Sequence, residues 1–166
     1  MPRFMAPPPS GEFTVKLSKP FTGMRVEYVR RDFCLRVIHA NSRCLATGTP
    51  THTVEIIGEP NRSSSISLTQ YNGSTASTKK SGDISKDDVQ ELMTLVNQLR
   101  GFPSSSSSDV YGVDTKLELN TFEIQWANDD DESNINTVEQ EQKTTFKDVV
   151  DSIEALARQS AKDAAI

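Results

Sequence analysis

The sequence is poor in the side chains that carry catalysis and bind metals, with two histidines and two cysteines among 166 residues. Nucleophilic catalysis needs a Ser or Cys beside a base that a third group orients, and no serine here lies in a G-x-S-x-G turn. Cys34, His39 and Cys44 have the spacing C-x4-H-x4-C. A zinc knuckle needs another cysteine where Arg31 stands, unless His52 supplies the fourth ligand. Since Cys34 and His39 would face opposite sides of a strand, we expect no metal site and no cofactor.

Long apolar segments are also absent, because no stretch approaches the roughly 18 apolar residues that span a bilayer. Residues 1–11 read MPRFMAPPPSG and contain no apolar core of a secretory signal. Their consecutive prolines predict a disordered, extended tail. Without an export signal, Cys34 and Cys44 are expected to be free thiols. These features predict a soluble cytoplasmic protein.

Charge is distributed unevenly along this acidic chain, whose net charge is −5. Residues 1–83 contain 11 Lys/Arg and 6 Asp/Glu, a net charge of +5, whereas residues 84–166 contain 7 and 17, a net charge of −10. An acidic half repels phosphate and disfavours nucleic acid as the main partner. The asymmetry favours a protein partner.

Apolar and polar residues alternate with a period of two in several segments. Such alternation predicts strands that have one buried and one solvated face. These segments are residues 13–17, 24–28, 33–37, 52–57, 65–71, 116–119 and 122–126. Between the fifth and sixth of them, residues 72–83 and 102–109 are rich in Gly, Ser, Thr, Lys or Pro. We expect both to be mobile loops.

Two segments have apolar residues at helical spacing. Ser85, followed by Asp87 and Asp88, matches a helix start, and Gly101 matches a helix end. The pattern predicts a helix over 85–100, whose apolar residues are Val89, Leu92, Met93, Val96 and Leu99. Thr144 or Thr145 is expected to cap a second helix, whose apolar residues are Phe146, Val149, Val150, Ile153, Leu156 and Ala157.

The predicted fold class is α+β. We expect a two-layer sandwich in which two amphipathic helices cover a mainly antiparallel, curved sheet of about seven strands. The alternative is a partial β-barrel plugged by the helices. Residues 12–160 would form one domain, and residues 161–166 a frayed C-terminus.

Two charged surfaces are candidate partner sites. One is basic: Lys16, Arg25 and Arg36 fall on the polar sides of the first three strands, and Arg30 and Arg31 stand in the connection between the second and third. It lacks the exposed aromatic residues that stack on RNA bases. The other is the acidic loop that contains Asp129, Asp130, Asp131 and Glu132. This loop does not match an EF-hand, because Asn134 and Gln140 stand at its sixth and twelfth positions.

The absence of a reactive constellation and the charge asymmetry favour a non-enzymatic protein-binding or scaffold module, or a subunit of a larger assembly. The alternative is a carrier for a small molecule or lipid, in which helix 85–100 would be the lid over an apolar cavity. An enzyme of an unrecognised kind would require Asp, Glu or His to converge in one pocket.

Overall fold

The computed structural model describes residues 12–21, 50–59, 61–73, 75–121, 124–130 and 138–163, and side chains up to Ser160. The predicted tail 1–11 and the predicted strands 24–28 and 33–37 lie outside these ranges.

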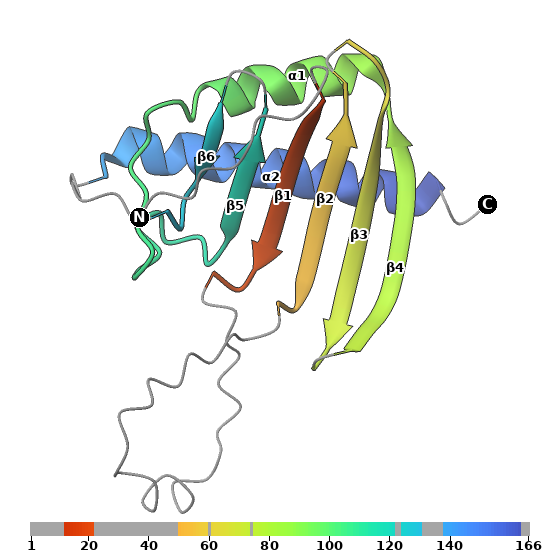
Figure 1. Ribbon diagram of the computed structural model, residues 1–166, viewed down its shortest axis with the longest axis horizontal. Coiled ribbons are helices and arrows are strands. Elements are labelled where there is room, and N and C mark those ends of the chain that lie inside the picture. Colours follow the sequence, from red (N-terminus) through yellow and green to blue (C-terminus); the bar gives the residue numbers. More distant parts are fainter. Residues whose placement is uncertain are drawn as a thin grey trace, which may run out of the picture.

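The described residues form one antiparallel sheet of six strands in the order β4-β3-β2-β1-β5-β6 (Figure 1). The strands are β1 (Phe13–Lys19), β2 (His52–Gly58), β3 (Ser64–Asn72), β4 (Thr75–Ile84), β5 (Lys116–Asn120) and β6 (Gln125–Ala127). The predicted α+β class is confirmed, although the strand count of the described residues differs slightly from seven. As far as these residues go, the sheet is open and does not close into the alternative barrel.

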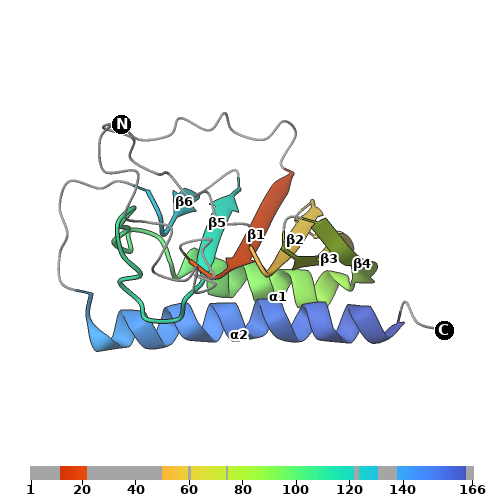
Figure 2. The same ribbon diagram turned by 90° about the horizontal axis from the view of Figure 1, so that it is seen from below.

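Two helices, α1 (Lys86–Asn97) and α2 (Gln140–Asp163), lie on the same face of this sheet (Figure 2). They run in opposite directions across the strands, and α2 extends beneath most of the sheet. Ser85 caps α1 as predicted, because its hydroxyl oxygen accepts a hydrogen bond from the Asp88 amide at 3.3 Å. This arrangement leaves the opposite face of the sheet free of both helices.

The predicted start of α2 at Thr144 or Thr145 is wrong, because the helix begins at Gln140. Thr144 lies inside the helix, where its hydroxyl donates to the Gln140 carbonyl at 3.0 Å. At the entry to the helix, the Gln142 side chain accepts a hydrogen bond from the Glu139 amide at 3.1 Å. The additional turn is polar, so the apolar pattern that starts at Phe146 could not reveal it.

The predicted loop at 72–83 is also wrong, because these residues form most of β4 and the end of β3. Nearly all of β4 is exposed and only Ile84 is buried, so this edge strand shows no apolar alternation. Gly73, with φ of +65°, makes the tight turn into it. Gly82 allows α2 to pass closely, since a Cβ there would lie 2.9 Å from the Ser160 Cβ.

The apolar faces of sheet and helices meet in one core, as the alternation predicted. Val15 from β1 is 0% exposed, and its partners in register are Ile56 on β2 and Leu119 on β5. The helices fill the other layer with Val89, Leu92, Val96, Val149 and Ile153, none more than 1% exposed. Burial of each such side chain contributes roughly 1.5–3 kcal/mol. Packing on the sheet therefore holds both helices in place.

An aromatic cluster closes the core at the β6 end. The rings of Tyr111 and Phe146 stack with centroids 4.2 Å apart, and the Trp126 ring meets Phe146 edge-on at 6.3 Å. The Trp126 indole N–H donates to the Phe102 carbonyl at 2.9 Å. The serine run after Phe102 is therefore anchored where it begins, and Ser104 is only 2% exposed.

Candidate functional site

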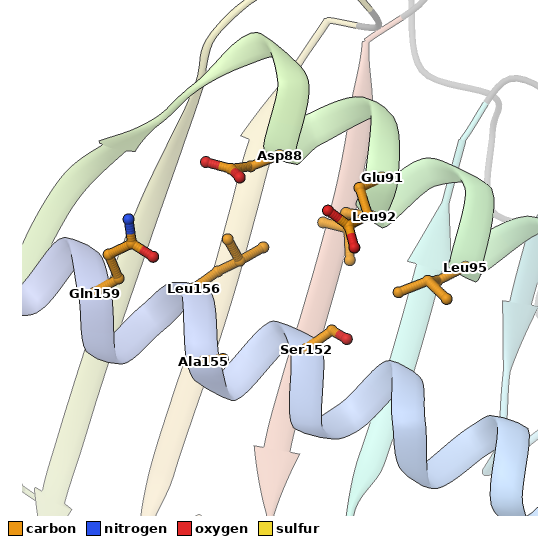
Figure 3. Close-up of a pocket in the computed structure, with 8 residues that line it drawn as sticks. All are labelled: Asp88, Glu91, Leu92, Leu95, Ser152, Ala155, Leu156 and Gln159. Atoms are coloured by element: carbon orange, nitrogen blue, oxygen red, sulfur yellow. The ribbon is translucent and has the colours of Figure 1, made fainter.

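A hollow of about 170 Å³ lies on the outer surface between the two helices, on the side away from the sheet (Figure 3). Residues of both helices line it: Asp88, Glu91, Leu92 and Leu95 from α1, and Ser152, Ala155, Leu156 and Gln159 from α2. Leu92 is buried, whereas Leu95 and Leu156 are half-buried. Apolar side chains are thus accessible at a seam that neither helix closes.

The hollow exists because α2 presents short side chains to α1. Ser152 and Ala155 carry too few atoms to cross the seam. The Ser152 hydroxyl also turns back to its own helix, where it donates to the Asp148 carbonyl at 2.9 Å. Both helices are fixed by their contacts with the sheet, so they cannot move closer to each other to fill the space.

A second hollow, of about 270 Å³, follows the same seam to the place where α1 ends and α2 begins. It is lined by Gln98, Phe102, Glu139, Glu141, Gln142 and Thr145. Thr145 and Ser152 are seven residues apart on α2, which is about 10 Å along a helix axis. We call the two hollows together the interhelical groove.

The walls of the interhelical groove are acidic. Among the described residues, Asp88, Glu91, Glu139 and Glu141 line it with their carboxylates, and no Lys or Arg of this part of the chain does. Asp88 accepts a hydrogen bond from the Ser85 hydroxyl at 2.8 Å. None of the ion pairs formed among the described residues involves the other three. These three carboxylates are therefore not held by an ion pair with a Lys or Arg of the described chain.

A different charged cluster ties α2 to the sheet. Lys19 and His52 are cross-strand partners on β1 and β2. The Lys19 ammonium donates to the Glu154 carboxylate on α2, and His52 Nε2 lies 4.0 Å from the same oxygen. Arg158 approaches the other carboxylate oxygen at 3.7 Å. Burial of the imidazole lowers the pKa of His52 below its usual 6.5; the charge of Glu154 opposes this effect and that of Lys19 adds to it.

The lowered pKa of His52 predicts a loss of stability in mild acid. The unfolded chain protonates His52 more readily than the folded chain does. The contribution of His52 to the free energy of unfolding is therefore fully present above the usual pKa of 6.5 and is lost as the pH falls through the lowered pKa. Urea unfolding measures the free energy of unfolding at about pH 7.5 and at about pH 5. Between these two pH values the wild type should lose more of it than His52→Gln does. Equal losses in both proteins would contradict this role for His52.

The predicted basic surface is described only at Lys16. This residue lies on the sheet face away from the helices, and its register partners on the two neighbouring strands are Glu55 and Glu118. The remaining members, Arg25, Arg30, Arg31 and Arg36, lie outside the described residues. Around Lys16 the described face thus alternates in charge. Ile57, on the same face, is 43% exposed.

The predicted acidic surface begins with residues that are already engaged in the fold. The Asp129 carboxylate accepts from Lys116 at 2.6 Å, and Glu118 accepts from the same ammonium at 2.9 Å. Partial burial disfavours the ammonium charge, but these two carboxylates outweigh that effect and raise the pKa of Lys116 above its usual 10.5. Asp130 is half-buried in a turn. Asp131 and Glu132 lie outside the described residues.

Among the described residues no three of His, Cys, Asp and Glu gather into a metal site, and Cys34, His39 and Cys44 lie outside them. The space between α1 and the sheet, where a carrier cavity was predicted, contains the buried side chains of α1. Within the described ranges, neither helix has the length and apolarity to cross a bilayer.

Sequence reasoning missed the interhelical groove, although two signals point to it. Leu95 and Leu156 stand at the edges of the two apolar stripes, where a side chain is only half covered. Ser152 and Ala155, at a spacing of three, mark a side of α2 with small residues.

No protein-family model, curated protein or solved structure matches this chain.

Proposed function

We propose that this chain is a non-catalytic protein-binding module and that the interhelical groove is its recognition site. One observation carries the proposal: leucine side chains remain accessible in a hollow between two helices that are otherwise firmly packed on the sheet. Apolar depressions on rigid elements are where side chains of a partner protein anchor.

The dimensions favour the side chains of a protein over a free small molecule. The two hollows measure about 170 and 270 Å³, below the roughly 300–1,000 Å³ of typical ligand pockets. They follow one another along a seam, so a ligand would have to be elongated. A polypeptide segment satisfies this requirement with successive side chains.

Ser152→Leu is expected to abolish partner binding, because the larger side chain fills the first hollow. Folding stability should stay equal or rise, since the new side chain is covered by Leu95 and Leu156. The measurement is affinity capture from an extract of the source cells, followed by quantitative mass spectrometry. The wild type should retain a partner at near-stoichiometric amounts that Ser152→Leu does not retain.

The matched control is Thr144→Leu. Thr144 also lies on α2, and its hydroxyl bonds to the carbonyl four residues earlier just as that of Ser152 does. Thr144 lines neither hollow, so its variant should recover the partner like the wild type. Equal recovery by Ser152→Leu, or no protein enriched by the wild type over empty resin, would overturn the proposed function.

A further inference from the structure

We infer that the occupant of the interhelical groove is an amphipathic helix of a partner protein, with apolar anchors along one face and Lys or Arg on both flanks. The inference rests on the proposed function and adds the chemistry of the partner to it. Spacing, charge and the shape of the groove each contribute to it.

The spacing comes from the two hollows. Leu92, Leu95 and Leu156 define the first, and Phe102 with Thr145 defines the second. Thr145 and Ser152 are only the facing edges of the two hollows, about 10 Å apart, and the lining residues of α2 extend from Glu141 to Gln159, about 27 Å. A helix lying along the groove carries apolar side chains on one face at every third or fourth position. It can therefore place an anchor in each hollow.

The expected charges of the partner helix follow from the acidic walls of the interhelical groove. Asp88 and Glu91 belong to the α1 side, and Glu139 and Glu141 stand at the start of α2. A helix between these walls would bring its two flanks beside carboxylates, as the flanking positions of a coiled coil do. Basic flanking residues would be attracted, whereas acidic residues there would be repelled.

A helical occupant fits better than an extended one. In an extended segment alternate side chains point away from the surface, so half of them could reach neither the leucines nor the carboxylates. A helix instead keeps an apolar stripe and two charged flanks on one side. In the groove it would rest on α1 and α2, which are themselves held by the sheet.

The test uses three synthetic peptides of roughly 16 residues, about four helical turns. The first has Leu at helical spacing and Lys at the other positions. The second has Glu in place of Lys. The third has the composition of the first in an order that destroys the apolar stripe. Fluorescence anisotropy measures the binding of each to the full chain at about 0.15 M salt, where long-range attraction is screened.

Only the first peptide should bind well, and Ser152→Leu should reduce that binding at least tenfold. Glu91→Gln should weaken it about two- to fivefold, as expected for one exposed charge pair. Asp87→Asn is the matched control, because it removes a carboxylate of α1 that lines neither hollow. It should leave the affinity within about twofold of the wild type.

Three results would overturn the inference. They are equal binding of the Lys and Glu peptides, binding of the shuffled peptide as tight as that of the first, and failure of the first peptide to bind. The failure of the inference is distinguishable from that of the proposed function. A natural partner that the wild type captures and Ser152→Leu does not would keep the groove as the site while excluding a basic helix as its occupant.

Discussion

Replacement of Phe146 by alanine is expected to destabilise the protein by about 3–5 kcal/mol, the range for loss of a large aromatic side chain from a core. Phe146 is 0% exposed. Its ring stacks on Tyr111 with an interplanar angle of 16° and meets the edge of Trp126. The substitution therefore removes the ring that joins α2 to the β6 end of the sheet.

Urea unfolding followed by tryptophan fluorescence measures this effect, because Trp126 is the single tryptophan of the chain and lies in the cluster. Thr144→Leu, on the exposed surface of the same helix, should change the free energy of unfolding by less than about 0.5 kcal/mol. A loss below about 1 kcal/mol for Phe146→Ala would show that the cluster does not anchor α2.

Asn128→Ala is expected to cost about 2–4 kcal/mol, since it leaves two buried backbone groups without their partners. The Asn128 side chain, in a residue that is 1% exposed, accepts from the Leu117 amide at 2.9 Å and donates to the Thr115 carbonyl at 2.8 Å. These bonds hold the chain that leaves β6 against the start of β5. Both the Oδ1 and the Nδ2 atom of Asn128 are needed, because each satisfies a different backbone group.

Asn128→Asp tests the two hydrogen bonds of this side chain separately. The carboxylate keeps an acceptor for the Leu117 amide but loses the donor to Thr115 and adds a buried charge. Chemical denaturation of both variants should therefore show clear destabilisation at neutral pH. Wild-type stability for either variant would mean that water satisfies these backbone groups.

The two-layer fold could be predicted because its strongest signal, apolar periodicity, coincides with its largest stabilising contribution. Val15 and Leu17 in β1 alternate with polar neighbours, and Leu92 and Val96 in α1 recur at helical spacing. Both patterns lead to the same core. Local pattern and tertiary packing agree at these positions, so sequence reasoning succeeds there.

The prediction failed where structure does not depend on local apolar residues. The strand β4 is held by hydrogen bonds to β3 and exposes nearly all its side chains, so only the tertiary pairing reveals it. Asn128, directly before the acidic loop, is polar like its solvent-facing neighbours in the sequence and yet is buried, so its role could not be predicted from the local pattern. The interhelical groove arises from the meeting of Leu95 and Ala155, far apart in sequence, and no single segment encodes it.

The central position of β1 has a consequence for the order in which the chain can fold. Leu17 on β1 lies opposite Leu117 on β5, so the middle of the sheet cannot form until about a hundred residues more have been synthesised. Pairings so distant in sequence slow folding. On the ribosome, α1 alone can cover the apolar faces of β1 to β4 until α2 emerges, and such partly exposed apolar surface makes a nascent intermediate prone to aggregate.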